Sequence, residues 1–213
     1  MGLGGCATRK IGPDALQSAR KPLQLNRSLS PRAPHGTLWV RSVRDRRPGV
    51  ELGSLNYLDA SYESNELYDV PLETVVGNAI LDAATSTGLF QGTNNTGSPH
   101  YVLDVEILHL YARLDRNLLS LIPVIPNIEV KARMELRLHL TDLDGRPFLS
   151  QQLDRQTSRW AAGITATDGL SRELLRVLLR QILAEWIPAA DQAIPLFWQG
   201  VGRPPADQGA IKR

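Results

Sequence analysis

The sequence predicts an α+β fold, in which a mostly antiparallel β-sheet carries two amphipathic helices on one face. Between Val130 and Leu140 apolar residues alternate with charged ones almost without interruption, which is typical of a strand with one buried and one solvated face. Two other segments, near Leu72 and near Leu170, have apolar residues at helical spacing. The resulting order, β-α-β-β-β-α, indicates helices gathered on one side of a sheet.

Length and composition fit one domain with flexible ends. The chain has 213 residues, of which 42% are hydrophobic and 22% charged, as in an ordinary globular protein. No apolar run approaches the roughly 18 residues that a spanning helix needs. A formal net charge of +2 gives no argument for nucleic-acid binding. We expect a single domain at 37–188.

The β-branched and aromatic run at 37–43 predicts the first strand, and the stretch Asp-Arg-Arg-Pro-Gly at 45–49 ends it. Asp45, Arg46 and Arg47 could bind an anion, because arginine forks suit phosphate and carboxylate groups. A polar loop at the end of a strand explains them equally well. The next stretch, 50–68, predicts a long loop, with or without a short hairpin.

The first helix is expected in the segment DVPLETVVGNAILDAATSTG, where Asp69 can cap the start, Pro71 suits the first turn and Gly88 ends the helix. Its apolar positions fall on one face: Leu72, Val75, Val76, Ala79, Ile80 and Ala83. This face is expected to pack on the sheet.

Three strands follow. The first begins at Tyr101 and runs toward Arg113, the second covers 129–140, and Asp144-Gly145 marks the hairpin turn to the third, at 148–160. One face of the second strand is basic at Lys131, Arg133, Arg137 and His139. It has no aromatic residue for base stacking, and Glu129 and Glu135 interrupt its charge, so a solvated face is expected rather than an RNA-binding one.

The second helix is expected at DGLSRELLRVLLRQILAEWIP and is predicted to end at Pro188. Its apolar set is Leu170, Leu174, Val177, Leu178, Ile182 and Trp186. The remainder, 189–213, contains repeated Pro and Gly and is expected to be a disordered tail.

Cys6 is the only cysteine, so an internal disulfide is excluded, and four scattered histidines do not form a Cys/His zinc cluster. Leu3-Gly4-Gly5-Cys6 resembles the lipobox of bacterial lipoproteins, in which a peptidase cleaves just before a lipid-modified cysteine. The resemblance implies lipid attachment at Cys6. Ala7 and Thr8, with no Asp after the cysteine, imply retention in the outer membrane. Met1-Gly2 does not supply the apolar stretch of about 7–15 residues that a secretory signal needs. Either the true start lies upstream, or the match is accidental.

The segment from Ala7 to Gly36 is rich in Pro, Ser, Arg and Lys and has no periodicity. Residues 1–36 are therefore expected to be a lipobox-like N-terminus followed by a flexible basic tether, which would span about 30 Å. Its charge favours anionic surfaces such as phospholipid head groups or cell-wall polymer.

No enzyme motif is present: the chain has no G-x-S-x-G, no P-loop and no G-x-G-x-x-G. The histidines His35, His100, His109 and His139 lie outside any known motif. Asp142 and Asp144 flank a turn, where Asp is favoured for backbone hydrogen bonding. We therefore expect no catalytic residue, metal site, cofactor or small-molecule substrate. The rival hypothesis is a small enzyme in which Asp45, Arg46 and Asp142 converge at one end of the sheet.

The chain resembles the YajG-like family of outer-membrane lipoproteins. The pieces that carry the resemblance are LWVRSVRDRRP, the Leu52-Gly53 pair, VPLETVVGNAILDAATSTGLF, YVLDVEILHLY and LTDLDGRPF, in this order, within 37–188. The ABC-transporter auxiliary lipoproteins have a similar layout and are the nearest competitor. The resemblance implies an accessory protein that faces the periplasm, and it implies no catalytic residues.

We accordingly expect a non-enzymatic lipoprotein, palmitate-modified at Cys6 and anchored to the periplasmic face of the outer membrane, which serves as an accessory or scaffold in envelope assembly or transport. The alternative is an auxiliary lipoprotein of an ABC-type lipid transport system. Partners are the membrane, through the covalent lipid, and an envelope protein or a second copy. No nucleic-acid partner is expected.

The segment NLLSLIPVIPNI at 117–128 is apolar although it lies between two long strands. Pro123 and Pro126 deny it a regular helix or a central strand, so an irregular hairpin tip is expected. The tip either folds back over the open end of the helix–sheet layers or docks on a partner. The candidate contact residues are Leu118, Leu119, Leu121, Ile122, Val124 and Ile125.

Overall fold

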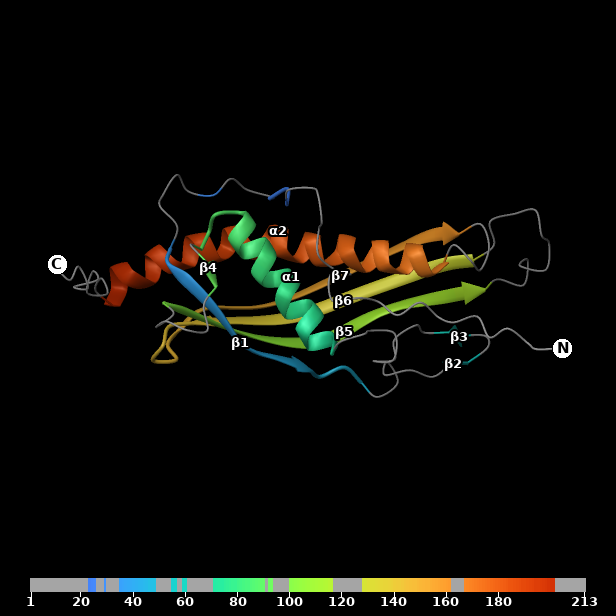
Figure 1. Cartoon of the computed structure of the whole chain (residues 1–213), viewed down its shortest axis with the longest axis horizontal. Coiled ribbons are helices and arrows are strands. Elements are labelled where there is room, and N and C mark those ends of the chain that lie inside the picture. The colour runs from blue at the N-terminus through green and yellow to red at the C-terminus, as the bar shows by residue number, and fades with distance from the viewer. Residues whose placement is uncertain are drawn as a thin grey trace, which may run out of the picture.

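The structure is a computed structural model, and it describes residues 23–25, 29, 35–48, 55–56, 59–60, 71–90, 92–93, 100–116, 128–161 and 167–201. Two helices lie on one face of a mixed, mostly antiparallel sheet (Figure 1). The predicted α+β class and the β-α-β-β-β-α order of the main elements are confirmed. Cys6, Asp69 and residues 117–127, which include the predicted hairpin tip, lie outside the described residues.

The sheet has the order β4-β1-β5-β6-β7. β5 (Tyr101–Arg116), β6 (Ile128–Thr141) and β7 (Pro147–Ala161) are antiparallel neighbours. β1 (Thr37–Asp45) lies parallel to β5, and the short β4 (Gly92–Thr93) pairs with the start of β1. Sequence periodicity did not reveal this parallel pairing, because it reports which face of a strand is buried and not the direction of its neighbour.

Two hairpins are found among the described strands, one outside the main sheet and one within it. β2 (Leu55–Asn56) and β3 (Asp59–Ala60) form an antiparallel pair inside the predicted loop. The predicted turn between β6 and β7 is confirmed: the amide of Gly145 donates to the carbonyl of Asp142 over 3.1 Å, and Gly145 has a φ of 81°. That conformation favours glycine because it lacks a Cβ.

A bulge in β5 changes which residues face the helices. The register shifts between Ile107 and His109, opposite Leu136 and Glu135 of β6. Before the bulge the core receives odd-numbered residues, such as Ile107. After it the core receives even-numbered residues, such as Leu110. The extra residue lets one long strand keep an apolar face toward both helices.

α1 (Leu72–Ser86) begins directly after Pro71, whose carbonyl accepts hydrogen bonds from the amides of Thr74 and Val75. The helix packs on β1, and it ends before Gly88, which has a φ of 75°. The predicted start and end are thus confirmed to within a residue or two.

α2 (Thr167–Val201) continues well beyond the predicted end. The prediction that it stops at Pro188 is wrong, and residues 189–201, which were expected in a disordered tail, are helical. Proline removes a helical hydrogen bond and clashes with the preceding turn. Tertiary packing outweighs this local cost here, because Ala190 and Ile194 beyond the proline are buried.

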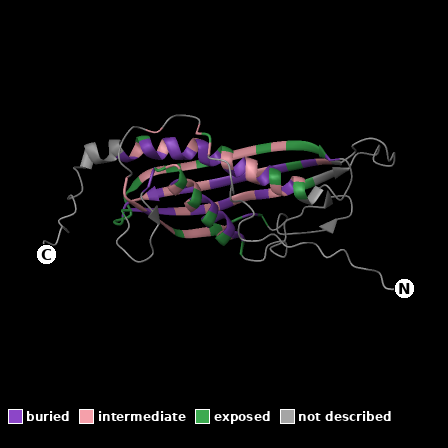
Figure 2. Ribbon diagram, turned by 45° about the horizontal axis from the view of Figure 1, so that its top comes forward, coloured by how far each residue is buried: buried purple, intermediate pink, exposed green. Residues whose placement is uncertain are grey.

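The core lies between the two helices and the inner face of the sheet (Figure 2). Trp186 of α2, Phe90 after α1 and Leu136 of β6 are among its largest fully buried side chains. Polar and charged residues cover the other face of the sheet, as the alternation in β6 predicted.

Candidate anchoring site

A few described residues of the N-terminal segment pack on the folded domain. Leu23, Leu25 and Leu29 are partly buried against the hydrophobic core. We call the described residues 23–25, 29 and 35–36 the N-terminal strap. For these residues the prediction of a flexible tether that lasts to Gly36 is wrong, because they pack on the folded domain.

The strap lies beside α2 at a groove. Leu23 and Gln24 of the strap line this groove together with Ala184 of α2, which is 5% exposed. Gln181, which lines the same groove, is exposed, so the strap leaves part of this side of α2 open to solvent.

A side-chain hydrogen bond holds the second end of the strap. Nε2 of His35 lies 2.9 Å from Oδ1 of Asp191, and the two side chains are 11% and 6% exposed. The amide of His35 also donates to the carbonyl of Leu89, which follows α1. His35 therefore joins the strap to α2 and to the end of α1.

The entry into β1 is equally tight. Gly36 has a φ of 100°, and a Cβ built on it would come within 3.0 Å of the ring of His100. The amide of His100 donates to the carbonyl of Thr37 over 3.1 Å. Glycine is therefore favoured at position 36. Its conformation sets the direction in which the chain passes from His35, beside Asp191, into β1.

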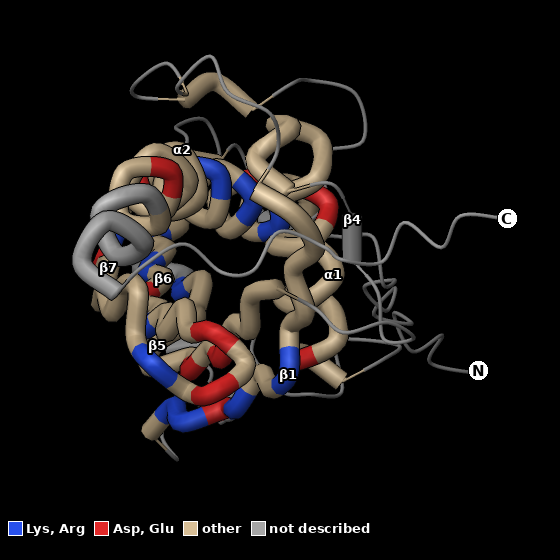
Figure 3. Tube along the Cα trace, turned by 90° about the vertical axis from the view of Figure 1, so that its left-hand side faces the viewer, with Lys and Arg blue, Asp and Glu red and all other residues tan. Residues whose placement is uncertain are grey.

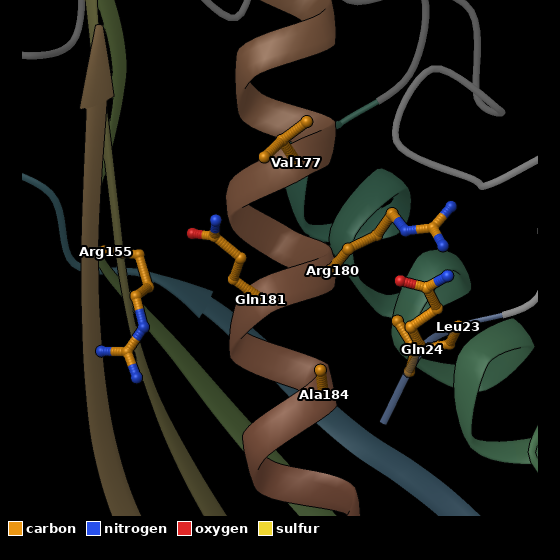
Figure 4. A pocket seen from close by; sticks show the side chains of 7 residues that line it. All are labelled: Leu23, Gln24, Arg155, Val177, Arg180, Gln181 and Ala184. Atoms are coloured by element: carbon orange, nitrogen blue, oxygen red, sulfur yellow. The ribbon is translucent and has the colours of Figure 1, made fainter. Parts of the chain in front are cut away.

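A groove of about 460 Å³ lies where the strap crosses α2 (Figure 4). Its lining residues come from the strap, from β7 and from the outer side of α2: Leu23, Gln24, Arg155, Val177, Arg180, Gln181 and Ala184. Val177, which was predicted in the apolar set of the second helix, is therefore a groove residue and only partly buried. Arg155 forms an ion pair with Glu185.

Asp45 and Arg47, two of the three residues of the predicted anion site, bind each other. Nη2 of Arg47 lies 2.7 Å from Asp45, and its Nη1 donates to the carbonyl of Leu110. The Arg47 side chain is 1% exposed. Burial raises the pKa of the Asp45 carboxyl, but the hydrogen bonds and charge of Arg47 outweigh it and hold that pKa below its ordinary value. This arrangement is that of a structural pair which secures the end of β1 against β5. Arg46 is exposed.

The residues of the rival enzyme hypothesis are not brought together. Asp45 pairs in register with Ile107, in the middle of β5, whereas Asp142 follows Thr141, whose partner is Val102 near the start of β5. At about 3.3 Å per residue these positions lie well over 10 Å apart along the sheet. Asp142 accepts hydrogen bonds from the amide of Arg146 and so serves the turn.

The outer face of the sheet carries a ladder of ion pairs. Arg133 bridges Glu135 and Asp154, Arg137 pairs with Glu106, and Arg41 pairs with Asp104. Burial raises the pKa of Asp104, but hydrogen bonds from Arg41 and Ser42 outweigh it and lower that pKa below its usual value. The charges of this face largely satisfy one another, so they leave little excess for a charged ligand.

In the described part of the chain, no group of three or more His, Cys, Asp or Glu side chains is placed to hold a metal ion. Neither described helix is long and apolar enough to cross a membrane.

His35 and Asp191 were missed by sequence reasoning. Asp191 lies beyond Pro188, the predicted end of the second helix, and His35 lies in a segment without periodicity. The available signals were weak: leucines at 23, 25 and 29 in an otherwise polar segment, and a single acid between apolar residues near Ile194.

Comparison with known proteins shows the fold. No family model matches the chain, and no curated protein matches its sequence. Protein XCC0632 from Xanthomonas campestris, assigned to the family DUF330, has a similar structure, with a TM-score of 0.50 and 12% identity over 84% of this chain and 97% of that chain. A minor lipoprotein from Acinetobacter baumannii matches with a TM-score of 0.41 and 12% identity, over 73% of this chain and 92% of that one. Neither is described as YajG-like.

Proposed function

We propose that this protein is a lipid-anchored, non-enzymatic accessory protein of the bacterial cell envelope, attached through Cys6 to the periplasmic face of the outer membrane. The observation that carries the proposal is the order of features along the N-terminal segment. The lipobox-like Leu3-Gly4-Gly5-Cys6 comes first, a basic stretch follows, and the strap then docks on α2.

The architecture suits an anchored adaptor. The strap holds the chain to the domain at Leu23 and again at His35, so a pull on the N-terminus acts on α2 and the core rather than on the end of β1 alone. The fold that the chain shares with XCC0632 is compatible with this role.

Metabolic labelling tests the anchor. In the native host, an alkyne analogue of palmitate should label the protein, Cys6→Ala should abolish the label, and Thr8→Ala should retain it. Mass spectrometry of membrane-purified protein should place the lipid on Cys6. An unlabelled wild-type protein, or a label that persists in Cys6→Ala, would refute the proposal.

A second variant tests the choice of membrane. Ala7→Asp introduces an acidic residue directly after Cys6, and by the sorting pattern of lipoproteins it should move the protein from the outer to the inner membrane on a density gradient. Ala7→Ser is the matched control and should leave the distribution unchanged. If wild-type protein already sediments with the inner membrane, the outer-membrane assignment is wrong while the lipid anchor still stands.

A further inference from the structure

We propose that the N-terminal strap is a reserve of tether, which comes away from the helices under tension while the rest of the domain stays folded. Its release lets the domain move further from its anchor without detaching from it. This role rests on the lipid anchor proposed at Cys6, whereas the release itself is tested on protein without lipid.

The chain is attached to the domain in two different ways on either side of Gly36. From Thr37 onward it belongs to β1, whose backbone pairs with β5 from Leu38 to Asp45. The described residues of the strap lie in no helix or strand, and among them His35 alone makes a backbone hydrogen bond to another described part of the domain, the carbonyl of Leu89. Side chains therefore hold most of the strap, whereas a backbone ladder holds β1.

The contacts of the strap become tighter toward its end. Leu23, Leu25 and Leu29 are only partly buried against the core. The side chains of His35 and Asp191, which are 11% and 6% exposed, lie 2.9 Å apart between Nε2 and Oδ1. Tension that enters from Cys6 loads the leucines first and His35 last. The strap should therefore peel from its beginning, with His35 as the final contact before β1.

The helices have contacts with the sheet that do not involve the strap. α1 packs on β1, and α2 packs on β5, β6 and β7. Figure 3 shows α1 on the side of β1 and α2 on the side of β7. Segments with few buried contacts open before a fully packed core. The strap can therefore leave while both helices remain on the sheet.

Release changes the greatest distance that the tether can span. With the strap docked at Leu23, the sixteen residues 7–22 connect Cys6 to the domain. Whatever their conformation, they reach at most about 55 Å. With the strap released, the connection is the thirty residues 7–36, and the limit rises to about 105 Å. The strap thus holds back roughly half of the possible reach.

Single-molecule pulling through Cys6 measures this reserve. Cys6 is the only native cysteine, so the unlipidated full chain with Gln156→Cys, at an exposed position of β7, carries two thiols for DNA handles. Because the strap spans the fourteen residues 23–36, the force should produce a reversible lengthening step of at most about 50 Å before the domain unfolds. Lengthening only at domain unfolding, or an early step longer than this limit, would overturn the proposal.

Substitution at Asp191 tests the final contact. Asp191→Ala removes the carboxylate beside His35, so the strap should be released about tenfold faster at the same force. The matched control, Gln192→Ala, changes the exposed neighbouring residue and should leave the release rate unchanged. The length gained at domain unfolding reports that each variant is folded. Equal release rates in the two variants would overturn the assignment of His35 as the final contact.

A second measurement follows release without force. In the Cys6→Ala chain, nitroxide labels at Gln24→Cys and Gln181→Cys lie on the strap and on α2, and both positions line the groove (Figure 4). The docked strap should give a dipolar-broadened spectrum, which the two singly labelled chains lack. With increasing urea, this broadening should disappear before the near-UV circular dichroism of the folded domain. Simultaneous loss of the two signals would show that the strap leaves only when the domain unfolds.

The two proposals fail separately. Absence of palmitate labelling in the wild-type protein would remove the anchor and leave the force step as measured. Absence of the force step would remove the reserve of tether and leave the labelling result intact.

Discussion

Nε2 of His35 and Oδ1 of Asp191 lie 2.9 Å apart although 156 residues separate them in the sequence. Asp191 is 4% exposed, and a buried carboxylate needs hydrogen-bonding partners. The pair therefore fixes two elements at once: the strap before β1 and the part of α2 that follows Pro188.

Asp191→Ala should lower the free energy of unfolding by about 1–3 kcal/mol, because it removes the Asp191 carboxylate from His35, whose side chain is only 11% exposed. Urea denaturation at neutral pH measures the loss. Hydrogen exchange at Leu23 and Leu25 should rise in the same variant if the strap is held from this end. Gln192→Ala, at the exposed neighbouring position, should change stability by no more than about 0.5 kcal/mol. Equal effects of the two substitutions would contradict the role of the pair.

Asp45→Asn should lower the free energy of unfolding by about 2–3 kcal/mol. This is somewhat less than the loss expected when one partner of a fully buried ion pair is removed. The Arg47 side chain is 1% exposed and would keep its charge after losing the Asp45 carboxylate, whereas Asp45 itself is 13% exposed. Thermal and urea unfolding measure the difference. Asp144→Asn removes the exposed pair with Arg146 and serves as the control, with an expected change within about 0.5 kcal/mol. A cost for Asp45→Asn as small as that of the control would show that the Asp45–Arg47 pair contributes little.

Stability should fall as the solution becomes acidic. The pKa values of Asp45 and Asp104 are lowered in the folded state, so the unfolded chain binds more protons in the acid range. Their stabilising contribution is present above the unfolded value near 4 and is lost as the pH falls through the lower folded values. Urea midpoints between pH 6 and pH 2 should decline less steeply in Asp45→Asn with Asp104→Asn than in the wild-type protein. Parallel curves for the two proteins would contradict this assignment.

Two glycines should respond in opposite directions to substitution by alanine. Gly145→Ala should cost about 1 kcal/mol or more, because a φ of 81° is unfavourable for a residue with a Cβ, even though nothing lies within 4 Å of it. Gly169→Ala in α2 also meets no neighbour and should stabilise by about 0.5–1 kcal/mol through helix propensity. Differential scanning calorimetry distinguishes the two signs. A stabilising Gly145→Ala would show that the turn relaxes to another conformation.

The sequence allowed the secondary elements to be predicted well, because each has a periodic apolar face. The alternation from Val130 to Leu140 and the helical spacing from Leu72 to Ile80 reflect burial against a single core. The prediction failed where tertiary contacts outweigh a local rule. Pro188 disfavours a helix locally, but burial of Ile194 extends α2 beyond it.

The anchoring site was less predictable for the same reason. Leu23 and His35 belong to no regular element, and their partners on α2 are distant in the sequence. A local pattern cannot reveal such contacts. The anion site proposed at Asp45, Arg46 and Arg47 was suggested by residue type alone, and the structure shows that Arg47 turns inward to Asp45 and the carbonyl of Leu110.

β7 is the last strand of the sheet, and it is fifteen residues long. A strand edge of that length is a template on which other chains can add and aggregate. On its helix-facing side, however, Arg155 and Arg159 hold ion pairs with Glu185 and Glu173 of α2. A strand added beside β7 would have to cover these charges. Copies of the protein that meet at these edges would thereby be kept from joining into a continuous sheet.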